Sequence, residues 1–311
     1  MTKITVITGQ TATGKTAYAL KNAEEKNGEL ISADSRQIYK GLDIITGKDI
    51  EKKNFKLGGQ IPMSVGGRRV LMNIGYYTVW GIKIWLYDVI DPEEPFSSYD
   101  FKQCALWVIN DIKSRGKLPI IVGGTYLYLK HLLYGVDTEN IPANWDLRKK
   151  LKNKPVPDLV SLLKKIDSKV FDRLNNSDKN NPHRLIRKIE IARSQKNTQS
   201  AKSSASGVKV DRFIGLRFED SQKLSAAIEK RVGERLEKGA IEEVDKLLKQ
   251  GLTKRAPGLR SLGYCQIIPY LEGKISKDEA IKKWIGAEVN YAKRQYTFMK
   301  TNKNIDWKLT R

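Results

Sequence analysis

The segment GQTATGKT at residues 9–16 constrains this 311-residue chain more than any other part of its sequence. It matches the phosphate-loop pattern G-x-x-x-x-G-K-[ST], follows a β-branched run over 3–8 and precedes a helical pattern over 16–26. In that setting, the backbone N–H groups of the loop and the positive end of the helix bind a di- or triphosphate. The segment therefore predicts an α/β fold of the phosphate-loop NTPase type, in which helices flank a parallel sheet.

Two side chains of this segment are expected to act directly on the phosphates. Lys15 reaches the outer oxygens, and the Thr16 hydroxyl is expected to hold Mg²⁺. ATPases, kinases and diphosphate-consuming transferases share the pattern, so it does not name a reaction. The full set expected to bind the phosphate groups is Gly9, Gln10, Thr11, Ala12, Thr13, Gly14, Lys15 and Thr16.

A polar segment, ADSRQIYKGLDIITGK at 33–48, follows the second predicted strand at 29–32. In a parallel sheet, the carboxyl ends of neighbouring strands face the same crevice. We therefore expect Asp34 to lie near the bound phosphate. The alternative is an aspartate that only caps a turn.

Hydrophobic patterns divide the chain into a core and an insertion. Further strands are predicted at 69–74, 83–88, 118–122 and 211–218, and further helices at 101–115, 125–134, 224–236, 241–248, 259–271 and 276–300. Residues 137–200 instead contain short helical patterns and no convincing strand. The predicted organisation is a catalytic core over 1–136 and 208–311 with basic C-terminal helices, an inserted all-helical subdomain over 137–200, and a polar flexible linker over 194–207.

The formal charge of +22 is distributed unevenly. Residues 1–147 carry 18 basic and 16 acidic residues, whereas 148–196 carry 15 and 5. Residues 197–257 carry 13 and 9, and 258–311 carry 11 and 5. A solvated lysine-rich surface is one explanation, and a face that binds a polyanion such as a nucleic acid is the other.

Other features indicate a chain of the reducing cytoplasm. No run of about eighteen apolar residues is present, so no membrane span is expected, and the N-terminus lacks the apolar core of an export signal. Two cysteines, Cys104 and Cys265, and two histidines, His131 and His183, are too few for a disulfide framework or a Cys/His zinc site.

Seven segments, in order along the chain, resemble the tRNA dimethylallyltransferases, also called tRNA isopentenyltransferases, and together they cover nearly the whole sequence. They are the phosphate loop at 9–16, ADSRQIYKGLDIITGK at 33–48, DVIDPEEPFSSYDF at 88–101, LPIIVGGTYLYLKHLL at 118–133, NPHRLIRKIEI at 181–191, LRSLGYCQIIPYLEG at 259–273 and NYAKRQYTFMK at 290–300. The chain lacks the zinc-finger extension of some eukaryotic relatives, so it is most similar to bacterial members.

The resemblance implies a reaction. The family transfers a dimethylallyl group from dimethylallyl diphosphate to N6 of the adenosine on the 3′ side of the tRNA anticodon (A37), and diphosphate leaves. The phosphate loop would then hold a prenyl diphosphate, with Lys15 and Thr16 stabilising the departing charge. Asp34 resembles the general base for the adenine amine, and Thr125 resembles the threonine that contacts the target nucleotide.

The resemblance also implies contacts with the anticodon stem-loop, from which the target base is extruded. The positions that match tRNA-contacting residues are Asp34, Ser35, Arg36, Gln37, Thr125, Arg148, His183, Arg184, Leu185, Ile186, Arg187, Lys293 and Arg294. In the last helical pattern, Tyr291 and Gln295 flank Lys293 and Arg294, so basic and aromatic groups are interleaved as on an RNA-facing surface. A solvated helix face is the simpler interpretation of that pattern.

One region departs from the family. Between Gly47 and Asp88 the chain is longer and glycine-rich, and Trp85-Leu-Tyr87 stands where relatives have a histidine pair. Three rival functions remain: an isopentenyltransferase acting on free adenine nucleotides, a phosphate-loop small-molecule kinase in which Asp88 positions magnesium, and a non-enzymatic RNA-binding protein. A monomer is expected, because the mechanism needs no second chain.

Overall fold

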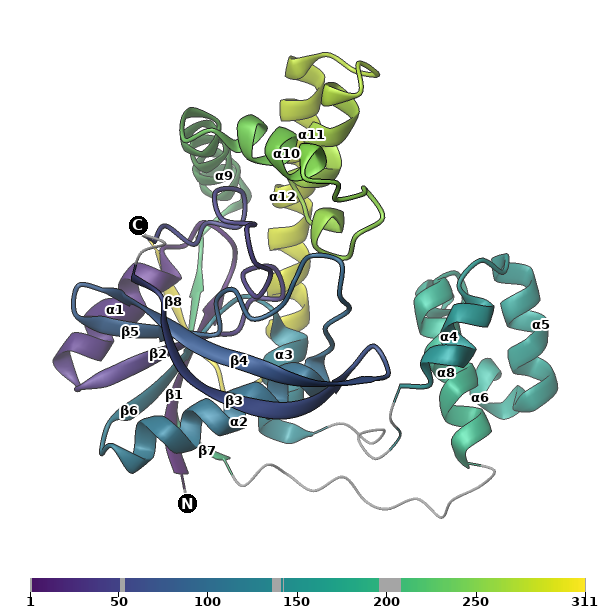
Figure 1. The fold of residues 1–311 in the computed structure, drawn as a ribbon, viewed down its shortest axis with the longest axis horizontal. Helices are drawn as coiled ribbons and strands as arrows, with labels where there is room; N and C mark the ends of the chain where they lie inside the picture. The colour runs from purple at the N-terminus through teal and green to yellow at the C-terminus, as the bar shows by residue number, and fades with distance from the viewer. Residues whose placement is uncertain (1, 51–53, 136–140, 142, 196–207, 311) are drawn as a thin grey trace. The chain divides into compact units, whose positions relative to one another are not determined.

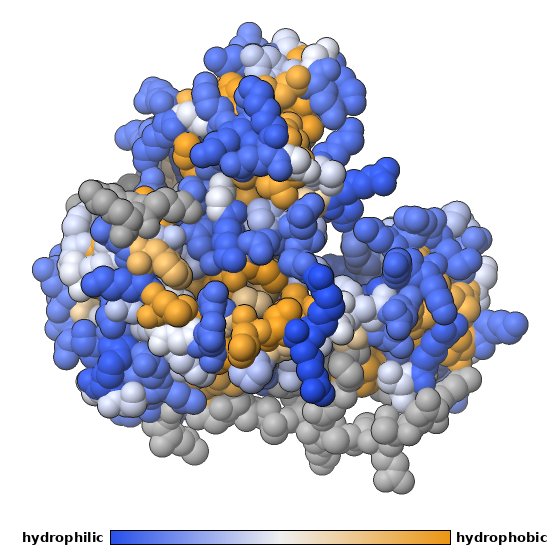
Figure 2. All heavy atoms as spheres, viewed as in Figure 1, coloured by the Kyte–Doolittle hydropathy of each residue, from blue (hydrophilic) through white to orange (hydrophobic). Residues whose placement is uncertain are grey.

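The computed structural model describes all residues except 1, 51–53, 136–140, 142, 196–207 and 311. The chain divides into two compact units, here called the sheet unit (1–65, 69–134 and 206–311) and the helical unit (66–68 and 135–205). No helix in the described part of the chain combines the length and apolarity that a membrane span needs. Hydrophilic residues cover most of the visible face of each unit in Figure 2.

The sheet unit is built on an eight-stranded sheet with the order β3-β4-β5-β2-β6-β1-β7-β8 (Figure 1). The strands are β1 Thr2–Gly9, β2 Gly28–Ser32, β3 Lys56–Val65, β4 Arg68–Val79, β5 Ile82–Trp85, β6 Leu118–Val122, β7 Val208–Arg217 and β8 Asp306–Leu309. The six strands from β5 to β8 in this order run parallel, as predicted. Strand β4 is antiparallel to β5, so the complete sheet is mixed.

The segment between Gly47 and Asp88 adds β3 and β4 to one edge of the sheet. The turn Gly66-Gly67 joins them with φ angles of 59° and 86°, and Trp80-Gly81 joins β4 to β5 with 49° and 77°. Positive φ at both central residues matches the two-residue turns that suit the twist of a hairpin. Strand β5 stops at Trp85, before the predicted end at Asp88, because Leu86 and Asp88 adopt positive φ.

The inner strands are buried on both faces, as the uninterrupted apolar pattern of a parallel sheet predicts. Ile31 and Ile121 belong to one hydrophobic cluster, whereas their neighbours Leu30 and Ile120 belong to another. Successive side chains of a strand point to opposite faces, so the two clusters are the layers on the two sides of the sheet. The sheet is therefore held rigidly, and its strand ends are firm supports for a site.

Helices of the sheet unit follow the predicted positions with one exception. They are α1 Lys15–Glu25, α2 Ser98–Ser114, α3 Tyr126–Tyr134, α9 Ser221–Glu237, α10 Ala240–Lys249, α11 Tyr264–Leu271 and α12 Lys277–Met299. The helix predicted over 259–271 is wrong in its first part: a short 3₁₀ turn, Gly258–Arg260, is separated from α11 by Gly263 at φ 89°. Helices α9 to α12 gather above the sheet in Figure 1.

Within its described residues, the helical unit contains five helices around a core of its own. They are α4 Trp145–Leu151, α5 Val156–Ile166, α6 Ser168–Asp172, α7 Asn176–Lys179 and α8 Pro182–Gln195. Leu159, Leu163, Leu185 and Ile189 are fully buried in that core. Of the predicted linker at 194–207, Ser194 lies within α8 and residues 196–207 lie outside the described residues.

Candidate active site

The phosphate loop connects β1 to α1 through a backbone that few side chains permit. Gly9 has φ 139°, and a Cβ there would lie 2.0 Å from the carbonyl oxygen of Leu216 in β7. Gly14 occupies the N-cap position of α1 in the left-handed region, where no side chain caps the helix. The first N–H groups of α1 therefore lack the side-chain acceptor that usually satisfies them, which suits a phosphate ligand.

Not every residue of the motif faces a ligand. The Gln10 side chain turns toward β7, where its Oε1 accepts a hydrogen bond from the Phe218 N–H at 3.0 Å. The Thr13 hydroxyl and the Lys15 ammonium both donate to the Gln10 carbonyl, at 2.8 and 2.6 Å. Gln10 and Thr13 thus shape the loop with their side chains.

A cavity of about 420 Å³ opens beside the phosphate loop, within the sheet unit. Its wall includes Lys15 and Thr16 of α1, Asp34 after β2, the Gly123–Gly124 turn after β6, and Arg231 of α9. The carboxyl ends of β1, β2 and β6 thus converge on one space, as the parallel topology predicts.

The surroundings of Lys15 shift the pKa of its ammonium group. Burial and the nearby Arg231 guanidinium lower its pKa to about 7, against the Asp34 carboxylate, which raises it. Sequence reasoning missed Arg231, because it used only the apolar stripe of α9. The segment 33–48 can approach Arg231 closely because Gly47 has no side chain: a Cβ on Gly47 would lie 2.9 Å from a guanidinium nitrogen of Arg231.

Two turns meet at the edge of the cavity and bring Asp34 and Thr125 together. The Ser35 N–H donates to Thr125 Oγ1 at 3.0 Å, and the Thr125 N–H donates to the Ala33 carbonyl at 3.3 Å. Asp34 Oδ1 accepts the Arg36 N–H at 2.8 Å, which orients its carboxylate. A Cβ on Gly123 would lie 2.3 Å from the Ala33 carbonyl oxygen, so the close approach requires glycine.

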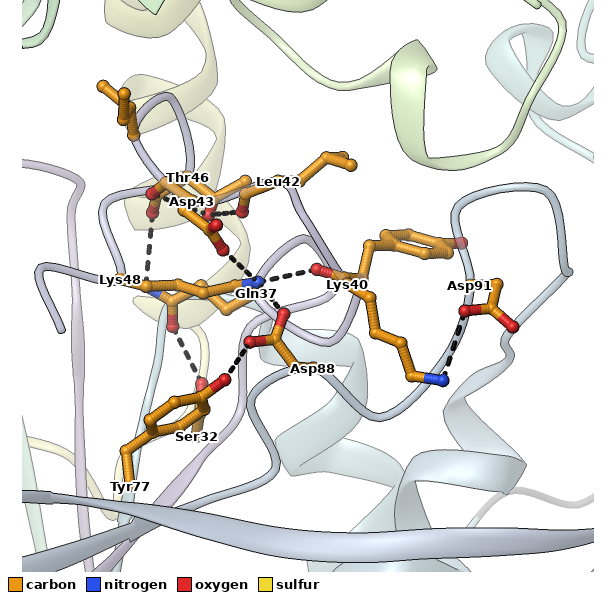
Figure 3. Close-up of polar contacts among 12 residues, drawn as sticks. Ser32, Gln37, Lys40, Leu42, Asp43, Thr46, Lys48, Tyr77, Asp88 and Asp91 are labelled. Carbon is orange, nitrogen blue, oxygen red and sulfur yellow. Dashed lines mark hydrogen bonds and ion pairs between the residues drawn. The ribbon is translucent and has the colours of Figure 1, made fainter. Parts of the chain in front are cut away.

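Hydrogen bonds of the Gln37 side chain stabilise the conformation of the segment 33–48 (Figure 3). Gln37 accepts a hydrogen bond from the Ser32 hydroxyl at 2.8 Å and donates to the Thr46 and Gly47 carbonyls at 3.2 and 3.1 Å. This placement makes Gln37 a cross-link of the loop, although it also lines the cavity. Arg36 is exposed beside it.

A buried ammonium group secures the end of the same segment. Lys48 Nζ donates to the Tyr39 carbonyl at 2.6 Å and to Asp43 Oδ1 at 3.0 Å, and it forms an ion pair with Asp88. The Tyr77 hydroxyl donates to the other oxygen of Asp88 at 2.5 Å, and its pKa is raised by burial and by this carboxylate. Asp88 lies outside the cavity wall, so nothing favours the magnesium-positioning role of a kinase.

The segment between Gly47 and Asp88 contributes Asp49 and Tyr87 to the cavity wall. Trp85 is buried and donates its indole N–H to Glu29 Oε2 at 2.9 Å. Tyr87, two residues later, lines the cavity, and burial together with the Asp34 charge raises its pKa. Trp85 therefore belongs to the core, and Tyr87 belongs to the cavity wall.

The residues of α12 that were predicted to face RNA lie partly on the exposed side of the helix and partly on its buried side. Lys293 and Arg294 are exposed, whereas Gln295 is buried and contacts the phosphate loop. Burial and the Asp34 charge raise the pKa of Tyr291 to about 12, against hydrogen bonds to Thr125 and Gln295. Only Lys293 and Arg294 of these four keep the surface position expected of an RNA contact.

In the helical unit, the structure corrects part of the predicted tRNA contact. Leu185 and Ile186 pack in the core with exposed fractions of 0% and 7%, so their side chains are not available to a ligand. They fall there because the inner face of α8 repeats Leu185 and Ile189 at helical spacing. His183 and Arg184 are exposed, and Arg184 also pairs with Asp178.

Arg148 and Arg187 share a buried carboxylate. Arg148 donates to Glu190 through Nε at 3.0 Å and Nη2 at 2.8 Å, and Arg187 forms an ion pair with the same side chain. Burial raises the pKa of Glu190, but the hydrogen bonds from Arg148 and Arg187 hold it below its usual range. Both arginines therefore have a structural task in this unit.

The fold and the site define a phosphate-loop α/β protein with a carboxylate beside the phosphate cavity. Residues 78–302 match the family model described as IPP transferase. A tRNA dimethylallyltransferase of Acetivibrio thermocellus is 38% identical, with 99% of this chain and 91% of that protein covered. One from Endomicrobium trichonymphae is 35% identical, with 98% and 94% covered.

A solved structure supports the same assignment. The full-length tRNA isopentenylpyrophosphate transferase of Bacillus halodurans superposes with a TM-score of 0.67 at 32% identity, over 100% of this chain and 90% of that one. The chain therefore belongs to the IPP transferase family, and the family resemblance inferred from its seven motifs is confirmed.

Proposed function

We propose that this chain transfers a dimethylallyl group from dimethylallyl diphosphate to N6 of the adenosine on the 3′ side of a tRNA anticodon, A37, and releases diphosphate. The observation that carries this proposal is a cavity lined by Lys15 and Asp34, with Thr125 held beside Asp34 by its hydrogen bond from the Ser35 N–H. The relatives named tRNA dimethylallyltransferase support the choice of reaction.

The diphosphate is held by the phosphate loop and by two cationic side chains. Backbone N–H groups at the start of α1, Lys15 and Arg231 face the space in which the negative charge of the leaving group increases. Arg231 joins this set on structural grounds alone, because it lines the cavity and lowers the pKa of Lys15.

The Thr16 hydroxyl, at the cavity wall, suits a Mg²⁺ ion. No three His, Cys, Asp or Glu side chains cluster as a metal site among the residues that the structure describes. Magnesium characteristically binds through few protein ligands together with substrate phosphates, so Thr16 and the diphosphate oxygens would hold it. When bound, the ion would neutralise part of the charge of the leaving diphosphate.

Asp34 acts as the general base. The adenine amine attacks C1 of the dimethylallyl group, the N6–C1 bond forms, the C1–oxygen bond to the diphosphate breaks, and the amine proton passes to the Asp34 carboxylate. Base catalysis is needed because this amine is delocalised into the ring and is a weak nucleophile. Thr125, fixed by the Ser35 N–H, orients the adenine beside Asp34.

The tRNA is bound by exposed groups of each unit. In the sheet unit these are Arg36, Lys293 and Arg294, with the half-buried Ser35 beside Arg36, and in the helical unit they are His183 and Arg184. Residues 148–196 carry 15 basic and 5 acidic residues, which suits the phosphate backbone of an anticodon stem. Arg148 and Arg187 support this surface through Glu190.

We expect the chain to act as a monomer in the cytoplasm. The proposed reaction needs one phosphate loop, one base and one tRNA-binding surface, and the sequence of one chain supplies each of them.

The proposal is tested with labelled dimethylallyl diphosphate, Mg²⁺ and either unmodified tRNA or AMP. Label is expected on tRNA and not on AMP, and the reverse result would favour an isopentenyltransferase of free nucleotides. Transfer of the γ-phosphate of ATP would favour a kinase. Asp34→Asn is expected to abolish transfer and to leave tRNA affinity within severalfold.

Asp91→Asn is the matched control for Asp34→Asn. Asp91 is an exposed aspartate that pairs with Lys40 at 3.2 Å and lies outside the cavity wall. Its variant should retain transfer. Loss of tRNA binding in Asp34→Asn to the same extent as the loss of transfer would show that Asp34 is a binding residue instead of a base.

A further inference from the structure

Gln295 of α12 connects two loops that approach the cavity from different strands. Its Oε1 accepts hydrogen bonds from the Thr11 N–H at 2.8 Å and from the Thr11 hydroxyl at 3.1 Å. Its Nε2 donates to the Gly124 carbonyl at 3.1 Å. Gln295 is 7% exposed; its hydrogen bond to Gly124 is buried, and its two hydrogen bonds from Thr11 are partly buried.

The surroundings of this amide are shaped to receive it. A Cβ on Gly124 would lie 2.2 Å from Gln295 Nε2, so only glycine leaves room for the side chain. Elsewhere along α12, the Ala292 carbonyl accepts from Gln10 Nε2 at 3.5 Å, and Met299 Sδ accepts from the Thr8 hydroxyl at 3.1 Å. The helix is thus attached at three levels to the end of β1 and the phosphate loop.

We propose that Gln295 is a positioning residue for the transfer reaction, setting the phosphate loop and the turn that holds the adenine at a fixed separation. The inference rests on the proposed function, because it assigns the two loops to the two substrates. Thr11 belongs to the loop that would bind the diphosphate. Gly124 directly precedes Thr125, which accepts the Ser35 N–H next to Asp34.

The geometry of the reaction explains why such a link matters. Displacement at C1 requires the amine and C1 to lie about 3–3.5 Å apart and in line with the leaving oxygen. The diphosphate fixes C1 and the Thr125 turn fixes the amine, so any slip between the loops changes this distance directly. A misplacement of about 1 Å costs roughly 100-fold in rate.

A second residue of α12 supports the link on its adenine side. Tyr291 lies one turn before Gln295, and Thr125 and Gln295 both act to lower its pKa, against burial and the Asp34 charge. The same helix exposes Lys293 and Arg294 to solvent. Helix α12 therefore holds the two loops on its inner side and offers its proposed RNA contacts on its outer side.

Gln295→Met tests the inference, because methionine keeps the length of the side chain and removes its hydrogen bonds. The matched control is Asn290→Met, the same kind of replacement at an exposed position of α12. Inorganic pyrophosphate binding is measured by calorimetry, binding of an anticodon stem-loop by fluorescence anisotropy, and kcat with both substrates saturating. All measurements are made well below the melting temperature of each variant.

For Gln295→Met we expect kcat to fall by roughly 100-fold and pyrophosphate binding to weaken by about fivefold, as for one lost hydrogen bond. Stem-loop affinity should stay within about twofold, because the side chain is buried. Asn290→Met should match the wild type in pyrophosphate affinity and melting temperature. A purely structural role would lower all three readouts together, in proportion to the folded fraction.

The inference is overturned if kcat and pyrophosphate affinity both stay within about twofold of wild type, or if all three readouts fall together. Wild-type protein that binds pyrophosphate and RNA but transfers nothing would refute the proposed function. In that case, the pyrophosphate affinity of Gln295→Met compared with wild type would still test whether Gln295 positions the phosphate loop. If Gln295→Met does not fold, Gly124→Ala displaces the same amide from the other side. It must reproduce the loss of kcat.

Discussion

The ion pair between Arg235 and Glu288 connects two helices that border the cavity, α9 and α12. Arg235 Nη1 lies 2.8 Å from Glu288 Oε1, and the two side chains are only 8% and 6% exposed. Trp284 donates its indole N–H to the same oxygen at 2.8 Å. Burial and the nearby Arg231 lower the pKa of Arg235 to about 10, and Glu288 opposes this shift.

We predict that Arg235→Met destabilises the protein by about 3–5 kcal/mol at neutral pH, the usual cost of leaving a buried charge without its partner. The structure offers little compensation, because Glu288 Oε2 has no hydrogen-bond partner in the described part of the chain. The double variant Arg235→Met/Glu288→Gln should recover most of the loss. It removes both charges and keeps an acceptor for Trp284.

The expected pH dependence has a definite sign. In Arg235→Met, the isolated Glu288 carboxyl should have a higher pKa in the folded state than in the unfolded state, because burial disfavours its charged form. The folded variant then binds protons more tightly, so its stability should increase as the pH falls from 8 to 5. The double variant should lack this response.

Urea denaturation followed by tryptophan fluorescence measures the effect, since Trp284 contacts Glu288 directly. Trp145 is the single tryptophan of the helical unit, and the other five belong to the sheet unit. The fluorescence change therefore reports mainly on unfolding of the sheet unit. The reasoning fails if Arg235→Met costs less than about 1 kcal/mol, or if the double variant is no more stable than the single one.

Four further outcomes follow from the site. Arg231→Ala should weaken pyrophosphate binding by roughly 10- to 100-fold in calorimetry, because a charge-assisted hydrogen bond is lost. The pKa of Lys15 is about 7, so its amine is mostly neutral at pH 8, and pyrophosphate binding by the wild type should then be accompanied by uptake of nearly one proton. Lys15→Met should not show this uptake, and in the wild type the uptake should be smaller at pH 6. Glu190→Gln should lower the melting temperature at pH 7. Because the pKa of Glu190 is lowered in the folded state, its contribution to stability is present above the unfolded pKa and is lost as the pH falls through the folded pKa, so the difference should shrink in acid. Removing Mg²⁺ with a chelator should weaken pyrophosphate binding by at least about tenfold, and unchanged affinity would argue against a metal at Thr16.

The centre of the site was predictable because it depends on local pattern and strand direction. The phosphate loop needs only a strand, a glycine-rich turn and a helix in sequence, and β1 and α1 supply them. Asp34 follows a parallel strand, so its place beside the phosphate loop was expected from topology, whereas Thr125, 91 residues further on, was named from the family resemblance. These predictions required no knowledge of how α9 to α12 pack.

Residues placed by long-range packing were not predictable in the same way. Arg231 lies beside Val232, which belongs to the apolar stripe of α9, and a polar residue there would ordinarily face solvent. Gln295 stands between exposed and buried residues of α12, and its contacts depend on where that helix crosses the phosphate loop. Helical periodicity identifies the buried side of a helix, but it does not say which loops that side will touch.

Matching a family motif residue by residue identifies positions without their orientation. Leu185 and Ile186 share a motif with Arg184, yet only Arg184 of the three is exposed. The spacing of Leu185 and Ile189 already indicated a core face, so this error could have been avoided. The edge hairpin was missed for a different reason: the Gly66-Gly67 pair marked a two-residue turn, but β3 has Gly58, Gly59 and Pro62, which weaken its strand pattern.

The charge of the whole chain and the charge of the cavity differ in a way that bears on mechanism. Of the charged side chains that line the cavity, Lys15, Lys230 and Arg231 are basic, and Asp34, Asp49 and Glu234 are acidic. Their formal charges cancel, and the pKa of Lys15 near 7 reduces its share further. The net positive charge of the chain therefore lies outside the cavity, where it suits a large polyanion better than a small diphosphate.

A site with so little net charge must hold a diphosphate by other means. Backbone N–H groups at the start of α1 contribute partial positive charge without a titratable group, and a Mg²⁺ ion at Thr16 would arrive together with the phosphates. Binding would also return a proton to Lys15, because a nearby anion raises its pKa. The carboxylates that cancel the charge of the unliganded cavity include Asp34, the proposed base, which must stay ionised to accept the amine proton. Because the acidic and basic side chains of the cavity cancel in formal charge, a carboxylate base and a diphosphate site can share one small space.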